Sequence, residues 1–361
     1  MRLLAIDMGT GTQDILLFDS DAPVENSVKL VMPSATEIAA RRIRRATAAG
    51  EAILLTGVTM GGGPCAWALE RHLQAGLTAY ATPEAARTFD DDLEAVAAIG
   101  VSIVSDDECG GLHGATHIEM RDLDLDAIRA ALAVFEVDTH IDGLALACLD
   151  HGAAPPGYSD RLFRFDHLRR VVEEQNDLRA FAYLPEELPA YLTRAASMLA
   201  GRDRNVPTVF LDTGPAAALG ALHDEQVRGT DEQLVLNLGN MHALAFHLSG
   251  THIHALYEHH TGEMSDEQIE SFTSRLLTGE LTQDEVFNSK GHGVYYADAH
   301  RGTPPIVAVT GPRRRRLRGS PLNPHFAAPH GDMMISGCFG LLDAFAEKYP
   351  DTKEAIERAL T

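Results

Sequence analysis

The amino-acid sequence predicts an α/β protein in which one structural unit occurs twice, with a cleft between the two copies. Residues 3–18 read as a strand, a glycine turn and a second strand, and residues 234–246 repeat that layout. Apolar strand patterns alternate with helical patterns along the chain, and 361 residues suffice for two domains that each bury a core. We expect an N-terminal lobe at residues 1–200 and a C-terminal lobe at residues 201–361.

The elements of the N-terminal half follow from apolar spacing and from glycine punctuation. The segment 35–49 has helical spacing and ends at Gly50, a residue type that commonly terminates helices. After the first hairpin we expect strands at 28–32, 52–55 and 144–149, helices at 35–49, 66–74 and 124–134, and further helices between 160 and 200.

The C-terminal half starts the same pattern again near Val206. Within its hairpin, Asn237 and Gly239 fall where Asp7 and Gly9 fall in the first hairpin. A duplicated α/β unit is the economical interpretation of this repeat.

Composition limits the classes of partner. A net charge of −22 argues against general affinity for nucleic acid or for an anionic membrane surface, because both need a basic face. No apolar run approaches the ~20 residues that span a bilayer. The N-terminus reaches an acidic residue at Asp7 without a signal-peptide pattern, so we expect a cytoplasmic protein.

The four cysteines, Cys65, Cys109, Cys148 and Cys338, are widely separated in the sequence. This spacing excludes a radical-SAM cluster motif and does not suit a zinc ribbon. We interpret them as small core residues.

The turn after the first strand reads Asp7-x-Gly9-Thr10-Gly11-Thr12-x-Asp14. Glycines let backbone N–H groups approach an anion, threonine hydroxyls add donors, and Asp7 can hold a hydrated Mg²⁺. Taken alone, the motif is equally compatible with an ordinary hairpin turn.

This turn resembles the first phosphate-binding hairpin of the superfamily that includes actin, Hsp70 chaperones, acetate kinase and sugar kinases. Four further segments resemble the other signatures of that superfamily, in the same order. Residues 210–220 resemble a connecting helix, 234–246 a second phosphate hairpin and 306–312 an adenosine turn. Residues 334–342 resemble a closing helix, in which small residues let it cross the connecting helix. The resemblance implies two ribonuclease H-like lobes in the actin-like ATPase fold, with ATP and Mg²⁺ between them.

The resemblance also implies nucleotide contacts in the C-terminal half, at Asn237, Gly239, Asn240, Thr310, Gly311 and Arg313. The second hairpin of the superfamily normally begins with aspartate, which is Asn237 in this sequence, and the adenosine turn normally has paired glycines. These departures put fast phosphoryl turnover in doubt.

Phosphoryl transfer often needs a carboxylate that takes the acceptor's proton, and the candidates are Asp150 and Asp212. Asp212 opens the connecting helix, although an alignment on its alanines places Thr213 at the usual aspartate position. Asp150 ends an apolar strand, and a turn or helix-cap role suits it equally.

Histidines are concentrated in the C-terminal half, where 11 of the 17 lie between His223 and His330. Strand alternation places Glu258 and His260 on one face, where they can share a transition metal with one of the more distant histidines. Those histidines are His242, His292, His325 and His330. Substrate contacts and plain packing remain alternatives to a metal site.

At closer range the chain resembles a prokaryotic family described as a pyruvate formate-lyase activating protein. The segments that carry the resemblance are 150–152, 258–262, 311–313 and 329–332. The description implies radical-SAM chemistry, which the cysteine spacing contradicts.

Three functions follow as hypotheses. The leading one is a Mg²⁺-dependent phosphotransferase or ATPase acting on a small molecule. A chaperone-like reactivase or regulatory switch, with a partner enzyme or a homodimer, is the alternative. A metal-dependent hydrolase or carbamoyl-transfer relative is the third.

Overall fold

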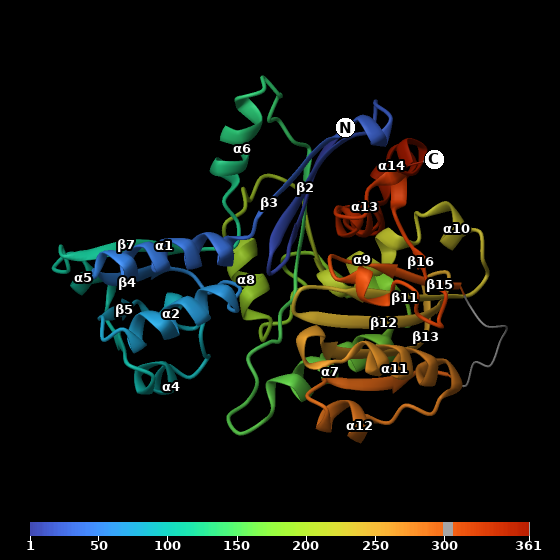
Figure 1. The fold of residues 1–361 in the computed structure, drawn as a ribbon. Helices are drawn as coiled ribbons and strands as arrows, with labels where there is room; N and C mark the ends of the chain where they lie inside the picture. Colours follow the sequence, from blue (N-terminus) through green and yellow to red (C-terminus); the bar gives the residue numbers. More distant parts are fainter. Residues whose placement is uncertain (299–305, 361) are drawn as a thin grey trace.

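The computed structural model describes residues 1–298 and 306–360, and these residues form three β-sheets with flanking helices (Figure 1). The sheet orders are β3-β2-β1-β8-β10-β9, β14-β13-β12-β11-β15-β16 and β6-β5-β4-β7. Within the described residues, no helix is both long and apolar enough to cross a membrane.

The first sheet begins with an antiparallel meander. Its strands are β1 (Arg2–Met8), β2 (Thr12–Asp19) and β3 (Val28–Pro33), joined by β8 (Gly143–Cys148), β10 (Thr208–Asp212) and β9 (Ala182–Tyr183). β8 runs parallel to β1, β10 runs parallel to β8, and β9 is antiparallel at the edge. Both faces of β1 and β8 are buried, which explains their continuous apolar sequences.

The second sheet repeats this order. Its meander is β11 (Gln233–Leu238), β12 (His242–Ser249) and β13 (His252–His260), followed by β15 (Ile306–Thr310), β16 (His325–Phe326) and the outer strand β14 (Gly293–Tyr296). β15 is parallel to β11, and β16 is parallel to β15. Two sheets with one meander-then-parallel topology are the duplicated ribonuclease H-like lobes of the actin-like ATPase fold, so the predicted fold class is confirmed.

The predicted boundary at residue 200 coincides with the end of α8 (Thr193–Ala200), and the last strands of the first sheet lie on either side of it. The division of the chain into lobes at that residue stays a prediction.

A third sheet, entirely parallel, is inserted between β3 and β8. It consists of β4 (Ala52–Gly57), β5 (Ala79–Ala81), β6 (Val101–Ile103) and β7 (Ala115–Met120), with helices α1 (Ala35–Ala49), α2 (Pro64–Gln74), α3 (Pro83–Ala86), α4 (Leu93–Ala98) and α5 (Asp106–Cys109). This insert has its own hydrophobic core and projects to the left in Figure 1. α1 begins at the Ser34 cap and ends at Gly50, whose φ of 69° is left-handed.

The remaining helices lie around the two larger sheets. They are α6 (Leu125–Ala133), α7 (Asp160–Glu174), α9 (Thr213–Ala221), α10 (Glu225–Arg228), α11 (Asp266–Thr278), α12 (Gln283–Asn288), α13 (Ser336–Lys348) and α14 (Lys353–Leu360).

Helices α9 and α13 cross each other and connect the two large sheets through one shared core. A Cβ on Gly220 would overlap the carbonyl oxygen of Ser336, and one on Gly340 would overlap that of Ala216. The expectation that small residues let these two helices cross is therefore confirmed.

Candidate functional site

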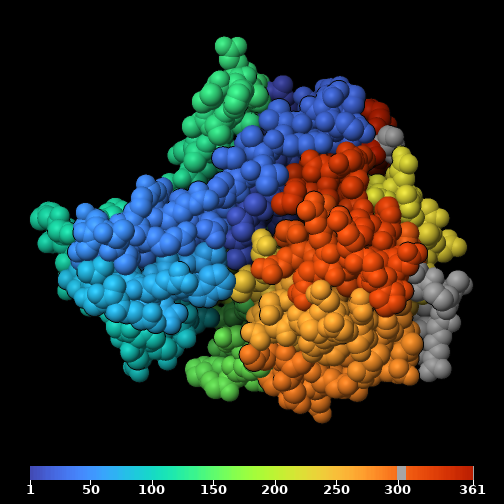
Figure 2. Space-filling view, viewed as in Figure 1, coloured from blue at the N-terminus to red at the C-terminus, as the bar shows by residue number. Residues whose placement is uncertain are grey.

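The two glycine hairpins face a single cleft. Figure 2 shows the recess between the blue insert and the orange and red C-terminal part, with the dark blue N-terminal strands at its bottom. A Cβ on Gly11 would overlap the side-chain amide of Asn240, so the tips of the hairpins touch. The predicted nucleotide-binding residues that line the cleft are Asp7, Gly9, Thr10, Thr12, Asn237, Gly239, Asn240, Thr310 and Gly311.

The hairpin turns are built alike. The N–H of Gly9 donates to the carbonyl of Thr12 at 3.0 Å, and the N–H of Gly239 donates to the carbonyl of His242 at 2.9 Å. The first turn is also anchored to the insert, because the Ser34 hydroxyl donates to the carbonyl of Thr10 at 2.6 Å. The helix cap of α1 thus fixes the turn that the sequence assigns to phosphate.

The adenosine turn lies beside the second hairpin because β15 pairs with β11, which sets Thr310 opposite Asn237. Gly311 has a φ of 91° and packs against the Leu238 carbonyl, where a side chain would clash. Arg313 is exposed and lies outside the cleft lining, although its N–H donates to the Leu238 carbonyl at 3.0 Å.

Two carboxylates share the floor of the cleft. Asp7 and Asp14 are paired across β1 and β2, and each is only 9% exposed. Asp7 accepts a hydrogen bond from the Thr213 hydroxyl, whereas Oδ1 of Asp14 has no hydrogen-bond partner among the described residues. Burial raises the pKa of Asp7 to about 6 and that of Asp14 to about 8. A divalent cation between the two carboxylates would offset the free-energy cost of burying their negative charges, so the pair fits Mg²⁺.

The proposed metal ligand Glu258 is engaged elsewhere. Arg164, on α7, is fully buried and pairs with both Asp212 and Glu258. Its Nε lies 3.2 Å from Oε2 of Glu258, and its Nη2 lies 3.0 Å from Oδ1 of Asp212. These carboxylates neutralise a buried guanidinium, and a role of Glu258 as a metal ligand stays a prediction.

The two candidate bases are held by backbone groups as well. Asp150 accepts hydrogen bonds from the N–H of Gly152 at 2.8 Å and of Ala195 at 2.9 Å, and Asp212 accepts one from the N–H of Gly214 at 3.0 Å. The turn and cap role considered for Asp150 is thus present, and a role as base for either residue stays a prediction.

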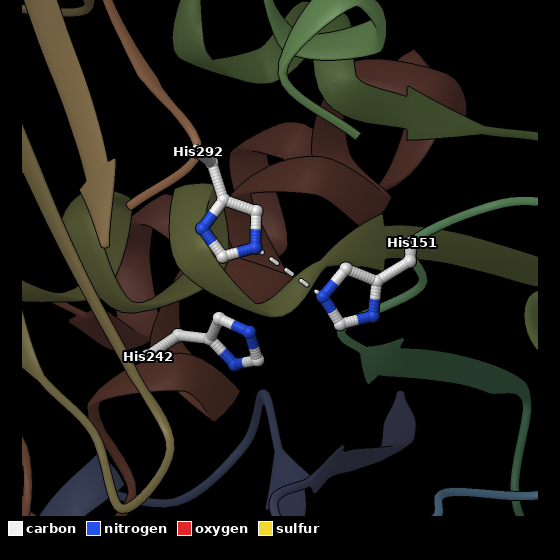
Figure 3. Close-up of side chains that lie close together, drawn as sticks. All are labelled: His151, His242 and His292. Carbon is white, nitrogen blue, oxygen red and sulfur yellow. Dashed lines mark hydrogen bonds between the residues drawn. The ribbon is translucent and has the colours of Figure 1, made fainter. Parts of the chain in front are cut away.

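Three histidine rings converge from separate segments (Figure 3). His151 follows β8, His242 begins β12 and His292 precedes β14, and one ring nitrogen from each lies within 4.8 Å of the others. His260 packs on the side of this cluster, with its ring centroid 4.8 Å from that of His242 and 4.6 Å from that of His292. The structure therefore groups His260 with histidines, and Glu258 with Arg164.

Sequence reasoning missed Arg164, the pairing of Asp14 with Asp7 and the role of His151 in this grouping. Asp14 stood within the first motif, and its position opposite Asp7 is the signal that was available. Arg164 gave no signal, because an arginine in a helix resembles an exposed surface residue.

The three buried cysteines lie in three different hydrophobic cores: Cys65 in that of the insert, Cys148 under the first sheet and Cys338 against α9. Cys109 is partly exposed at the end of α5. They do not approach one another as ligands of an iron–sulfur cluster would.

Among proteins with curated descriptions, none matches this chain. Solved structures match at low similarity. One, described as "a putative N-acetylmannosamine kinase" from Listeria monocytogenes, is 11% identical with a TM-score of 0.36, over 97% of this chain and 100% of that chain. A ROK hexokinase from Thermus thermophilus is 12% identical with a TM-score of 0.26, over 70% of this chain and 48% of that chain.

A ROK family transcriptional regulator, described as a homolog of the E. coli MLC protein, is 10% identical with a TM-score of 0.27, over 70% of this chain and 38% of that chain. This chain therefore spans less than half the length of two of the three structures. The fold is assigned from the strand order of the two large sheets.

A family model matches residues 60–316, which is more than half of the chain. The match covers the insert from α2 onward, the histidine cluster and the second hairpin. The chain belongs to the family described as "Putative pyruvate format-lyase activating enzyme (DUF1786)".

Proposed function

We propose that this protein binds ATP with Mg²⁺ in the cleft between its hairpins and acts as a phosphotransferase or ATPase on a small molecule. The observation that carries the proposal is the buried pair Asp7 and Asp14 on the cleft floor, beside two glycine turns. Glycine turns suit polyphosphate, and a carboxylate pair with an unpartnered oxygen suits the cation that accompanies it.

The roles of the chain's own residues follow from their contacts. Asp7 and Asp14 would hold Mg²⁺, whose positive charge offsets that of the phosphates. The Thr213 hydroxyl orients Asp7, and Arg164 holds Asp212 at the start of α9, next to Thr213. Thr10, Gly11 and Asn240 would contact the phosphates from the two hairpin tips.

A second function is favoured by a specific observation. Asp150 and Asp212 are both tied to backbone or guanidinium partners, and Asn237 replaces a carboxylate in the second hairpin. This arrangement suits slow hydrolysis, in which nucleotide state controls lobe closure. The family description, an activating enzyme, fits a nucleotide-dependent activator of a partner enzyme that works without an iron–sulfur cluster.

The test is calorimetric titration of the protein with ATP, with and without Mg²⁺. Replacing Asp7 or Asp14 by Asn removes a cation ligand while conserving shape, and we expect Mg²⁺-dependent affinity to fall about tenfold or more. The matched control is Asp126→Asn, because that side chain is 95% exposed on α6. ATP affinity that is unchanged in both cleft variants would remove the proposal.

Two further measurements separate the two functions. ADP release that rises with an added acceptor supports a phosphotransferase. ATP hydrolysis that is slow alone and changes on adding a partner enzyme supports the activator.

A further inference from the structure

Two rings of the histidine cluster have the spacing of ligands to one metal ion. Nε2 of His151 lies 3.4 Å from Nε2 of His292. Two nitrogens bound tetrahedrally at 2.0–2.1 Å to one Zn²⁺ are separated by about 3.3–3.4 Å. The ring of His242 faces the same point from below in Figure 3, with centroids 5.1 Å from His151 and 5.2 Å from His292.

One ring nitrogen of the cluster has no hydrogen-bond partner. Nε2 of His242 is buried and unpartnered among the described residues. A buried polar atom without a partner costs about 1–3 kcal/mol, so this nitrogen calls for a ligand. Lone pairs on imidazole nitrogens are what a transition metal takes.

The protonation state of the rings also suits a cation. Burial lowers the pKa of His151 to about 3 and lowers those of His242 and His292 as well, so these imidazoles are neutral. Neutral imidazole is the form that binds metal.

We propose that His151, His242 and His292 bind one divalent transition-metal ion of the Zn²⁺ class, with the fourth coordination position open to water or substrate. His260 touches two of the rings but lies outside the group of three whose nitrogens converge. Three protein ligands with one open position are typical of catalytic zinc sites.

The position of the site gives it a role beyond nucleotide binding. His151 comes from the end of β8 in the first sheet, and His242 and His292 come from the second, so one ion would link both lobes. His242 also lines the cleft. A metal there would polarise a carbonyl or phosphoryl oxygen of the small-molecule substrate, or a bound water.

The test uses the full chain, purified without chelators or a histidine tag. Elemental analysis is expected to find about one zinc per chain, and Co²⁺ added to the metal-free protein should give the visible absorption of tetrahedral coordination. His151→Ala, His242→Ala and His292→Ala should each weaken Zn²⁺ binding at least about 100-fold. His260→Ala is the matched control and should keep the metal.

Failure of this proposal is distinct from failure of the nucleotide proposal. Asp7→Asn and Asp14→Asn should retain zinc, and His151→Ala and His292→Ala should retain ATP and Mg²⁺ binding. The proposal is overturned if wild-type protein takes up no stoichiometric Zn²⁺ or Co²⁺, or if the three histidine variants bind Zn²⁺ as tightly as wild type. The wild-type measurements alone can overturn the proposal, so the test does not depend on how well a variant folds.

Discussion

Arg164 neutralises two buried carboxylates. It is fully buried and is the shared partner of Asp212 and Glu258, which are at most 5% exposed. Arg164 also donates to the Asp150 carbonyl at 3.3 Å, so it connects the loop after β8, the end of β10 and β13. One side chain thus fixes elements of both lobes.

Replacing Arg164 by Met should therefore strongly destabilise the protein. Methionine fills the space but leaves two buried carboxylates unpaired, a change that typically costs about 3–5 kcal/mol. The measurement is chemical denaturation at neutral pH. Arg169→Met is the control, because Arg169 is 49% exposed on the same helix and should change stability by under about 1 kcal/mol. Equal effects of the two substitutions would contradict a central role for Arg164.

A second residue-scale prediction concerns pH. Burial lowers the pKa of His167 to about 4, and its Nδ1 lies 3.0 Å from the Tyr191 hydroxyl. The folded state keeps the His167 ring neutral, whereas the unfolded state can protonate it. The folded state therefore has its full stability above the unfolded pKa near 6.5, and this stability is lost as pH falls toward 4.

Between pH 7 and pH 4, His167→Gln should therefore lose less stability than wild type, by on the order of 3 kcal/mol. Denaturation curves at several pH values measure this difference. His140→Gln, at a side chain that is 75% exposed, should track the wild type. Parallel pH profiles for wild type and His167→Gln would refute the buried neutral state.

At the scale of elements, the crossing of α9 and α13 depends on glycine. A methyl group at Gly220 would meet the Ser336 carbonyl, which is backbone and cannot rotate away. Gly220→Ala should thus destabilise the protein by about 1–3 kcal/mol or more, although alanine favours helix. Thermal unfolding measures the effect. Gly114→Ala is the matched control, because nothing lies within 4 Å of the added Cβ. A neutral Gly220→Ala would mean that the helices pack differently.

Elements that depend on local pattern were predictable from sequence. The hairpins around Gly9 and Gly239 and the helix 35–49 with its Gly50 stop follow from neighbouring residues alone. The insert shows the limit. The strands predicted at 52–55 and 28–32 looked equivalent in sequence. Strand 52–55 belongs to the parallel sheet of the insert and strand 28–32 to the meander, because strand partners come from distant segments.

The same limit applies to the site. The glycine turns and Asp7 were found because their chemistry lies within one short motif. The convergence of His151 with His242 and His292 could not be found, since it requires the register of two sheets. Alternation along β13 suggested Glu258 beside His260, but it carried no information about Arg164 on α7.

At the scale of the whole molecule, three bodies surround one cleft. Ser34 ties the insert to the first hairpin, and Arg194 pairs with Asp122 at 2.7 Å and donates to the Leu149 carbonyl at 2.6 Å. The second lobe closes the cleft through contact between Asn240 and Gly11. The cavity that remains has a volume of about 120 Å³, whereas sites for drug-sized ligands measure about 300–1,000 Å³.

We predict that a nucleotide needs the hairpin tips to separate, and a reversible cross-link can test this. The Cβ built at position 11 lies 3.3 Å from Cγ of Asn240, so cysteines at these two positions can form a disulfide. In a Cys109→Ser background, the oxidised Gly11→Cys, Asn240→Cys protein should lose ATP and Mg²⁺ binding, and reduction should restore it. The single Gly11→Cys variant controls for the substitution itself. If the cross-linked protein binds ATP as tightly as its reduced form, the tips need not part and the nucleotide must enter elsewhere.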